Sequence, residues 1–541
     1  MAKIKNPILQ GFNPDPSICR IGKDFYLATS TFEWLPGIAI HHSKDMVQWQ
    51  LICHPLTQSD QIDLRGMIDS AGIWAPSLSF ADGLFYMVYT LVRTRVGAYK
   101  DVHNFVITSP SIHGPWSKPT YLNSSGFDPS LFHDADGRKW VVNMQWDHRP
   151  HRPNFAGIIL QEFDAKQEKL VGPIHKLLEK DLLIEGPNLY KHDEYYYLML
   201  AEGGTGWNHG ISMARSRSVT GPYELDPQPA VLTTRDHPDY PLQKAGHGEL
   251  VRAPDGQWYM AHLCSRPVGK NRRCMMGRET AIQKVTWTHD GWLRLSDGGV
   301  LPALEVEIPD VSQDAMDNKT RCFVDDFNST TLALDWSTLR VPAEESWLSL
   351  SARPGHLRLR GRESCQSLFE QSLVAVRLTE PTCTAKTVLE AAPKTYQQMA
   401  GLICWYDTKT HFFLHLTHDE THGRVLCIMF CDDGQYEELR DVQIPVNDWD
   451  KCHLCASFTE GNLQFTVSKD AKNWQTIGPV FDGSKLSDDY GDGLHFTGAF
   501  IGLCAVDMDQ QQLLADFDCF ELTNHLTPLQ TNSTNATGVR A

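Results

Sequence analysis

The sequence has a shortage of positive charge and contains no long apolar run. Lysine and arginine total 49 against 66 aspartates and glutamates, which gives a formal net charge of -17 at pH 7. A field of this sign repels phosphate backbones and anionic lipid surfaces, so neither nucleic acid nor a membrane is an expected partner. The first residues lack the apolar run of about 7 to 15 residues that a secretory signal needs. We therefore expect a cytoplasmic location.

A disulfide framework and a helical pattern are also missing. Fourteen cysteines are scattered through 541 residues, which without a secretion signal favours reduced, buried thiols. Cys452 and Cys455 form a C-x-x-C pair, but no second ligand pair stands at a matching spacing, so no zinc site is predicted there. Short strand-favouring runs bounded by turn residues, such as residues 25–29 and 195–199, replace helical periodicity. The chain is therefore predicted to be all-β.

A diffuse repeat organises the first half of the chain. A turn containing Asp, Glu or Gly is followed by an aromatic-rich strand at residues 23–26, 83–86, 137–140, 193–196 and 256–259. The interval of about 55 to 63 residues is the length of one four-stranded antiparallel sheet with extended loops. Five such sheets arranged radially make a five-bladed β-propeller, which we predict for residues 1–304.

The second half predicts a different all-β domain. Residues 305–321 contain a proline and a polar run that are typical of a linker. Residues 322–525 carry many short strands, and two stacked antiparallel sheets are the simplest way to bury their apolar faces. This region is therefore predicted to be a β-sandwich, followed by a polar C-terminal tail over residues 526–541.

A second motif precedes each aromatic strand of the first half by about ten to twelve residues. It contributes Asp15, Trp74, Asp128, Glu185 and His247 in turn. If each motif begins the innermost strand of a blade, these residues occupy equivalent positions around the propeller axis and face one another. Each alone has a structural explanation, since Asp beside Pro is a common turn residue. Three carboxylates in one channel are costly unless they are paired or used, so the set predicts a functional site.

Converging carboxylates suit the hydrolysis of a glycosidic bond. One carboxylate must take a proton from water while another gives a proton to the leaving oxygen. The negative charge of Asp128 is expected to raise the pKa of Glu185 and to keep it protonated near neutral pH. Trp74 is expected to offer a flat apolar face to a sugar ring.

Longer ordered motifs cover nearly the whole chain, among them NPILQGFNPDPS at residues 6–17, GIWAP at 72–76, GFDPSLF at 126–132, EGP at 185–187 and GRETAIQK at 277–284. With these motifs the sequence resembles glycoside hydrolase family 43, and within it the two-domain β-xylosidases. The resemblance implies a five-bladed β-propeller followed by a concanavalin-like β-sandwich, and an inverting mechanism. It implies that Asp15 is the general base, Glu185 the general acid, and Asp128 the residue that orients and tunes the acid. In such a mechanism the base and the acid stand about 6.5 to 9.5 Å apart.

The resemblance also implies how a sugar would be held. Arg278 is expected to bind sugar hydroxyls, and Phe32 and Trp74 are expected to form walls of the nonreducing-end subsite. Phe496 is expected to come from a sandwich loop that closes the pocket, which would make the enzyme exo-acting. His247 is expected beneath the substrate and is a candidate ligand of a Ca²⁺ ion in the propeller channel, because in some relatives the matching histidine holds a Ca²⁺ ion or a water there. No cofactor is expected to be required.

The sequence thus predicts an exo-acting inverting β-1,4-xylosidase that releases xylose from the nonreducing end of short xylooligosaccharides. An α-L-arabinofuranosidase, or an enzyme with both activities, stays open, because the two sugars present similar hydroxyl patterns. A noncatalytic carbohydrate-binding propeller is an alternative of another class, although a lectin has no need for a protonated acid. A homo-oligomer, dimer or tetramer, is expected because sandwich domains often contribute contacts between chains.

Overall fold

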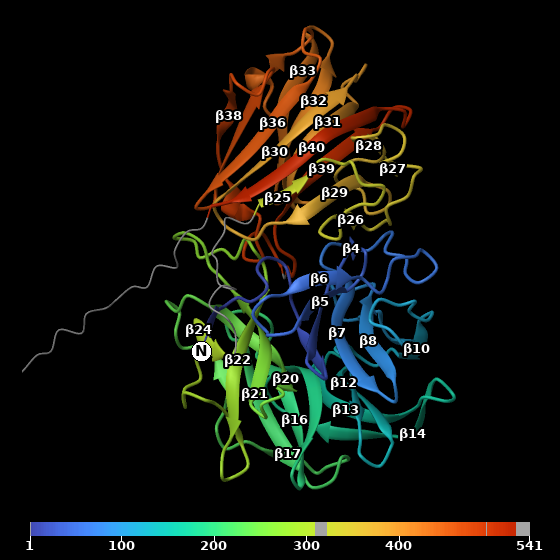
Figure 1. Ribbon diagram of the computed structural model, residues 1–541, viewed down its shortest axis with the longest axis vertical. Coiled ribbons are helices and arrows are strands. Elements are labelled where there is room, and N and C mark those ends of the chain that lie inside the picture. Colours follow the sequence, from blue (N-terminus) through green and yellow to red (C-terminus); the bar gives the residue numbers. More distant parts are fainter. Residues whose placement is uncertain (1, 309–321, 494, 526–541) are drawn as a thin grey trace, which may run out of the picture.

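A computed structural model describes residues 2–308, 322–493 and 495–525 of the chain. The described part consists of β-strands, with only two short 3-10 helices at Arg440–Val442 and Gly483–Lys485. No helix among these residues is long and apolar enough to cross a membrane, and all fourteen cysteines are free thiols. The two halves of the chain are stacked along the long axis, the first coloured blue to green and the second yellow to red (Figure 1). The all-β prediction is confirmed.

The first half forms five antiparallel sheets, one after another along the chain. The first blade contains β2 (Ser17–Ile21), β3 (Asp24–Thr29), β5 (Ala39–Ser43) and β6 (Gln50–Cys53), and the second contains β7 (Gly72–Ala81), β8 (Leu84–Val92), β9 (Val102–Ser109) and β10 (Thr120–Asn123). The third contains β11 (Ser130–His133), β12 (Lys139–Trp146), β13 (Phe155–Asp164) and β14 (Lys169–Leu178). The fourth contains β15 (Ile184–His192), β16 (Tyr195–Glu202), β17 (Gly210–Ser216), β18 (Glu224–Leu225) and β19 (Leu232–Thr233), and the fifth contains β20 (Gln243–Arg252), β21 (Trp258–Ser265), β22 (Glu279–Trp287) and β23 (Leu293–Leu295).

The ring of blades is closed at its first strand. Strand β2 contacts β7 of the second blade on one side and β20 of the fifth blade on the other. The two ends of the propeller chain are also joined, because β1 (Ala2–Lys5) pairs with β24 (Glu305–Ile308). The predicted five-bladed propeller is confirmed. Residues 305–308, which were expected to begin the linker, form a strand; residues 309–321 and the tail at 526–541 lie outside the described residues.

The second half is a β-sandwich of two antiparallel sheets, as predicted. One sheet contains β25 (Cys322–Asp325), β27 (Leu348–Ser349), β28 (Leu357–Arg360), β30 (Cys383–Ala391), β36 (Cys452–Thr459), β37 (Asn462–Ser468), β38 (Gln475–Asp482) and β40 (Leu514–Asn524). The other contains β4 (Trp34–Leu35), β26 (Ser337–Leu339), β29 (Ser372–Arg377), β31 (Gln398–Asp407), β32 (Thr410–Asp419), β33 (Gly423–Asp432), β34 (Gln435–Glu438), β35 (Ile444–Pro445) and β39 (Phe500–Asp507). Fully buried side chains such as Leu402, Leu414, Leu454 and Phe465 form the core, where facing apolar surfaces are removed from water.

The two domains share a sheet. Strand β4 belongs to the first blade's stretch of chain, yet it pairs with β26 at the edge of a sandwich sheet. Trp34 on β4 stacks on Phe500 with ring centroids 3.9 Å apart. Arg340, just beyond β26, donates a hydrogen bond of 2.6 Å to Asp69 of the propeller. These contacts hold the sandwich against the propeller, next to the loop that contains Phe496.

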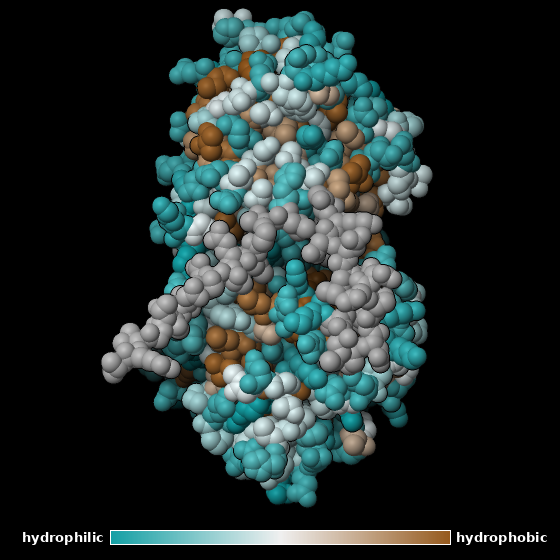
Figure 2. Space-filling view, turned by 60° about the vertical axis from the view of Figure 1, so that its left-hand side comes forward, coloured by the Kyte–Doolittle hydropathy of each residue, from teal (hydrophilic) through white to brown (hydrophobic). Residues whose placement is uncertain are grey.

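The surface is mostly hydrophilic on the face shown in Figure 2, where apolar residues gather in separate patches on both halves. Exposed large apolar side chains occur in both domains, with Val96 and Ile174 in the propeller and Phe369, Tyr396 and Val480 in the sandwich. Singly exposed apolar residues of this kind are normal in globular proteins.

Candidate active site

The innermost strand of each blade is associated with a residue in the left-handed backbone region, which lies just before the strand in the first and third blades and inside the strand in the others. These residues are Asp15 (φ 53°), Ala75 (φ 28°), Asp128 (φ 54°), Gly186 (φ 53°) and His247 (φ 44°). A proline follows each of the first four, and Gly248 follows His247. A left-handed conformation is unfavourable for residues other than glycine by about 1 to 3 kcal/mol, and such strain clusters at functional sites.

This backbone pattern corrects the predicted ring of equivalent positions. Asp15, Asp128 and His247 do occupy equivalent positions, but Trp74 and Glu185 each lie one residue before theirs, which are taken by Ala75 and Gly186. The pairing of β7 with β8 and of β15 with β16 shifts register directly after Trp74 and Glu185. Such bulges re-aim side chains near active sites, and motif spacing in the sequence does not resolve them. All five predicted residues nevertheless line one cavity of about 670 Å³.

Asp15 is held by three neighbours inside this cavity. Its Oδ1 accepts a hydrogen bond of 2.9 Å from Nη1 of Arg278, and its Oδ2 accepts one of 2.7 Å from the Ser30 hydroxyl. Nδ1 of His247 lies 3.6 Å from Oδ1. A charge-assisted bond to Arg and a bond from a hydroxyl fix both oxygens of the carboxyl group.

Arg278 links Asp15 to the sandwich. Its side chain is buried, and Nε and Nη2 donate to the carbonyl oxygen of Phe496 at 3.2 and 3.1 Å. Nη1 also donates to the Thr205 hydroxyl at 3.2 Å. An exposed, purely electrostatic role for Arg278 is therefore excluded, since the guanidinium is a structural element of the cavity wall.

Asp128 is a buried and Glu185 a partly buried carboxyl group, and both have raised pKa values. Burial raises the pKa of Glu185 to about 7, and the charge of Asp15 adds to the effect while Arg278 and Lys100 oppose it. Burial also raises the pKa of Asp128 well above its usual range, with further contributions from the charges of Glu185 and Asp15. The expected rise for Glu185 is thus present, but burial is its main cause and Asp15, rather than Asp128, is the charge that adds to it.

Asp128 contacts the backbone that carries Glu185. Its Oδ2 accepts a hydrogen bond of 3.1 Å from the N–H of Gly186. The N–H of Asp128 is itself bonded to the hydroxyl of Thr90 at 3.2 Å. Asp128 therefore connects the second, third and fourth blades at the point where Glu185 enters the cavity.

The three predicted aromatic residues meet at one side of the cavity. The ring centroid of Phe32 lies 5.8 Å from that of Trp74 and 6.1 Å from that of Phe496. The ring centroids of Trp74 and Phe496 are 5.4 Å apart. The N–H of Phe496, on the sandwich loop, donates to the hydroxyl of Ser70 at 3.1 Å. The sandwich thus supplies part of the wall, and Phe127 extends it at 5.5 Å from Trp74.

His247 lies between this cavity and a small one of about 10 Å³ on the axis below. Burial lowers the pKa of His247, with Asp15 opposing, so the imidazole is neutral at pH 7. The smaller cavity is also lined by Glu249, which sequence reasoning missed; it accepts the Ile18 N–H at 2.8 Å, and burial raises its pKa to about 8.

The donor set around His247 does not fit a Ca²⁺ ion held by side chains. Ca²⁺ takes six to eight oxygen ligands, whereas His247 offers nitrogen. Among the described residues, His247 belongs to no group of three His, Cys, Asp or Glu side chains whose ligand atoms lie within 4.8 Å of one another. A cavity of about 10 Å³ has the size of a single water molecule.

Several cavity residues had no signal in the sequence analysis. Lys100 and Trp146 come from different blades, and Nζ of Lys100 lies 4.5 Å from the centre of the Trp146 ring. Lys244 donates a bond of 2.7 Å to Asp489 of the sandwich. Trp207 is the exception, because it ends the glycine-rich run GGTGW at residues 203–207, which marks a loop that carries an aromatic side chain.

A propeller axis that gathers carboxyl groups of raised pKa beside aromatic walls is typical of a glycoside hydrolase. A sequence model described as glycosyl hydrolases family 43 matches residues 4–293, and one described as the beta xylosidase C-terminal concanavalin A-like domain matches residues 324–523. The chain therefore belongs to glycosyl hydrolase family 43, with the two-domain architecture of its β-xylosidases.

Relatives match over nearly the full length. A xylosidase/arabinosidase of Humicola insolens is 46% identical, covering 96% of this chain and 97% of its own. A beta-xylosidase of Bacillus subtilis is 43% identical and covers 96% of this chain and 99% of its own. The crystal structure of a xylan beta-1,4-xylosidase from Bacillus halodurans is similar with a TM-score of 0.94 and 49% identity, covering 96% of this chain and 100% of its own.

Proposed function

We propose that this family 43 hydrolase is an exo-acting inverting β-1,4-xylosidase that releases xylose from the nonreducing end of short xylooligosaccharides. The observation that carries the proposal is the presence, in one cavity, of an Arg-bound Asp15 and of a Glu185 whose pKa is raised to about 7. The names of the similar proteins, which are xylosidases, support the sugar.

In the proposed reaction, Asp15 acts as general base and Glu185 as general acid. Asp15 takes a proton from a water whose oxygen attacks the anomeric carbon from the face opposite the leaving group. The glycosidic C–O bond breaks, and Glu185 gives its proton to the departing oxygen. One step at the anomeric carbon inverts its configuration, so a β-xyloside yields α-xylose. Exchange with solvent then removes the proton from Asp15 and returns one to Glu185, which resets both groups.

Asp128 is proposed to position the acid. Its bond to the Gly186 N–H fixes the backbone next to Glu185. The charge of Glu185 helps to raise the pKa of Asp128, whereas the charge that helps to raise the pKa of Glu185 comes from Asp15.

The nonreducing-end subsite is proposed to lie between Phe32, Trp74 and Phe496. Their rings surround an apolar space that suits one face of a pyranose. Arg278 and His247 are proposed to bind hydroxyl groups, since both line the cavity beside Asp15. The sandwich loop that carries Phe496 closes this side, and this closure supports exo rather than endo cleavage.

A second activity is favoured by one comparison. The Humicola insolens relative is named both xylosidase and arabinosidase, so α-L-arabinofuranosidase activity at the same site is the alternative. A noncatalytic carbohydrate-binding propeller is the alternative of another class, and it predicts binding without cleavage.

The proposal is tested by a proton NMR time course of xylobiose hydrolysis, which records the anomer that appears before mutarotation. We expect α-xylose first, and cleavage by the Asp15→Ala protein slower by about 10²- to 10⁴-fold. First appearance of β-xylose would reject the inverting mechanism. Absence of xylose, with arabinose released from an α-L-arabinofuranoside, would reassign the substrate; absence of both would favour the binding propeller.

We propose that the reaction requires no metal ion. The misfit of Ca²⁺ to the donors around His247 supports this. Treatment of the purified enzyme with EDTA, followed by dialysis, should leave kcat and KM on xylobiose unchanged. A loss of activity that Ca²⁺ restores would overturn the proposal and return a metal to the channel.

We propose a cytoplasmic homo-oligomer, dimer or tetramer, that binds no nucleic acid. Fourteen free cysteines, most of them buried, suit a reducing compartment. Sandwich domains often contribute contacts between chains, which supports the assembly. Cell fractionation tests the location, and light scattering coupled to size exclusion tests the assembly; a periplasmic or secreted protein, or a monomer, would contradict the respective part.

A further inference from the structure

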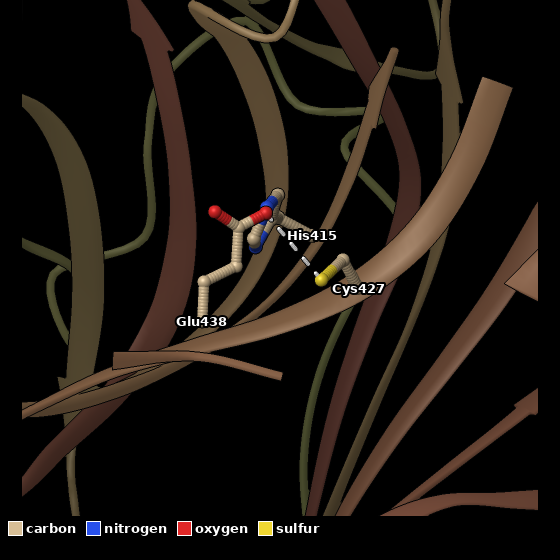
Figure 3. Close-up of side chains that lie close together, drawn as sticks. All are labelled: His415, Cys427 and Glu438. Atoms are coloured by element: carbon tan, nitrogen blue, oxygen red, sulfur yellow. Dashed lines mark hydrogen bonds between the residues drawn. The ribbon is translucent and has the colours of Figure 1, made fainter. Parts of the chain in front are cut away.

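Three metal-binding residue types meet on the sandwich, away from the propeller cavity. His415 on β32 and Cys427 on β33 are directly opposite each other in the sheet. Glu438, at the end of β34, pairs with Met429, which is two residues beyond Cys427 on its strand. Side chains two residues apart on a strand share a face, so the imidazole, the thiol and the carboxyl group converge (Figure 3).

The spacing of the three groups matches a tetrahedral ion. Sγ of Cys427 lies 3.6 Å from Oε1 of Glu438, and one ligand atom of each residue lies within 4.8 Å of the others. With Zn–S of about 2.3 Å and Zn–O of about 2.1 Å, tetrahedral geometry places sulfur and oxygen about 3.6 Å apart.

The imidazole is oriented as a metal ligand would be. Nδ1 of His415 lies 3.2 Å from the carbonyl oxygen of Phe413, an arrangement that puts the proton on Nδ1. Nε2 makes no hydrogen bond to any described residue, which leaves its lone pair for an ion. Ligating histidines commonly donate their other nitrogen to a backbone carbonyl in this way.

The donor types select the class of ion. Sulfur, nitrogen and oxygen together suit a borderline ion such as Zn²⁺, whereas Ca²⁺ and Mg²⁺ take oxygen alone. The side-chain amide of Gln443 lies 3.9 Å from Sγ of Cys427. Amide oxygen and nitrogen are assigned from the hydrogen-bond network, so the reversed amide presents its oxygen as a fourth donor.

We propose that His415, Cys427 and Glu438 form a Zn²⁺ site that fastens the edge strand β34 to the sandwich sheet. Binding replaces the thiol proton of Cys427, which passes to solvent as the Zn–S bond forms. The charges of thiolate and carboxylate then balance the dication beside a neutral imidazole. The site does not depend on the proposed glycosidase mechanism, because none of its residues lines the catalytic cavity.

The chain contains a matched control for this site. Cys431 and His411 form the same kind of cross-strand pair on β33 and β32, four residues from Cys427 and His415. The residue opposite Cys431 on β34 is Tyr436, so a carboxylate does not complete this pair. The two pairs therefore differ in the third ligand.

The test uses the full-length protein, reduced, stripped with EDTA and dialysed. Titration with Co²⁺ should show one ion per chain and a thiolate-to-cobalt charge-transfer absorption, and calorimetry should show one Zn²⁺ bound. Cys427→Ser should abolish the absorption, and Glu438→Gln should weaken Zn²⁺ binding by more than about 10-fold, the lower limit seen for outer-shell changes. Cys431→Ser should bind as the wild type does.

The inference is overturned if the wild-type protein shows no cobalt–thiolate absorption, or if Cys431→Ser weakens binding as much as Cys427→Ser. Glu438→Gln keeps the test decisive if Cys427→Ser fails to fold, because residue 438 is at a partly exposed strand end. Zn²⁺ should also raise the Tm of the wild type and of Cys431→Ser but not that of Glu438→Gln, while kcat on an aryl xyloside stays unchanged. An equal rise in all three proteins would contradict the assignment.

Discussion

Two buried groups of acidic side chains in this protein differ in how their charges are matched. Near the domain junction, Arg266 makes two hydrogen bonds of 2.8 Å to Glu279 and further bonds of 3.1 and 3.2 Å to Glu380. Glu279 also accepts the N–H of Gly11 at 2.8 Å. In the catalytic cavity, the single guanidinium of Arg278 bonds only Asp15 among the three carboxyl groups.

This difference in charge matching distinguishes a structural cluster of acids from a group of acids that can transfer a proton. A buried acid whose oxygens are all bonded has no capacity left for a substrate, and it stabilises only while its partner remains. A buried acid without a cationic partner keeps its proton and can give it away. The group of Arg266, Glu279 and Glu380 is therefore a structural cluster in which the acids are bonded to a cation. Asp128 and Glu185 have no bonded cation, which favours their protonated forms and suits Glu185 to proton transfer.

The largest expected effect follows the removal of the base. Asp15→Ala should lower kcat/KM by about 10²- to 10⁴-fold on every substrate, activated or not, because water loses its proton acceptor. Steady-state kinetics on xylobiose and on aryl xylosides measures it. Asp24→Ala, which changes a partly exposed aspartate of the same blade that does not line the catalytic cavity, is the control and should have normal kinetics. Substantial turnover by Asp15→Ala would remove it from the base position.

Removal of the acid should discriminate between leaving groups. Glu185→Ala should lose about 10²- to 10⁴-fold in kcat/KM on xylobiose but far less on xylosides whose phenolate departs without a proton. In the wild type, kcat/KM should fall as pH rises through about 7, where Glu185 loses its proton; this limb should be absent in the variant. Equal loss on both substrates would contradict the acid role.

Breaking the matched group should cost stability instead of chemistry. Arg266→Ala leaves Glu279 and Glu380 buried without their cation, and we expect unfolding to become easier by about 3 to 5 kcal/mol. Urea unfolding followed by tryptophan fluorescence measures it. Arg138→Ala, which removes an exposed ion pair with Asp136, should change stability by less than about 1 kcal/mol. Similar losses of unfolding free energy in Arg266→Ala and Arg138→Ala would contradict the structural role of the buried Arg266 cluster.

The smallest effect is a gain. Between pH 4.5 and about 7 an unfolded chain has lost the Glu185 proton while the native protein keeps it, so native stability falls as pH rises through this window. Glu185→Gln removes that fall and should be more stable than the wild type at pH 8, by up to about 3 kcal/mol. Below pH 4.5 the two should differ little. If the free energies of unfolding of the wild type and of Glu185→Gln changed in parallel across this pH range, the pKa of Glu185 would not be raised in the native protein.

Much of the site was predictable because its residues recur in short motifs. Asp15 and Asp128 each precede a proline at the start of a blade, so residue type and spacing identified them. The one-residue offset of Glu185 was not predictable, because bulges arise from strand pairing rather than from composition. Lys100 and Asp489 reach the cavity from segments with no repeat, and only tertiary structure brings them in.

The sandwich was predictable as a fold, but its contribution to the site was less so. The apolar strands after residue 322 predicted two sheets, and the position of Phe496 came from family resemblance alone. The pairing of β4 with a sandwich sheet could not be predicted from the sequence, because a two-residue strand is too short to show an alternation of apolar and polar residues.

Because β4 pairs with β26, the boundary between the two domains along the chain differs from the boundary between them in space. A sandwich produced from residue 322 onward would leave β26 without its outer neighbour, exposing unpaired amides and carbonyls along a flat sheet margin. Margins of this kind recruit strands from other molecules. Strand β4 therefore covers the edge strand β26 and protects it from pairing with other molecules. If the two domains are produced separately, the sandwich needs residues 34–35 to keep this edge covered.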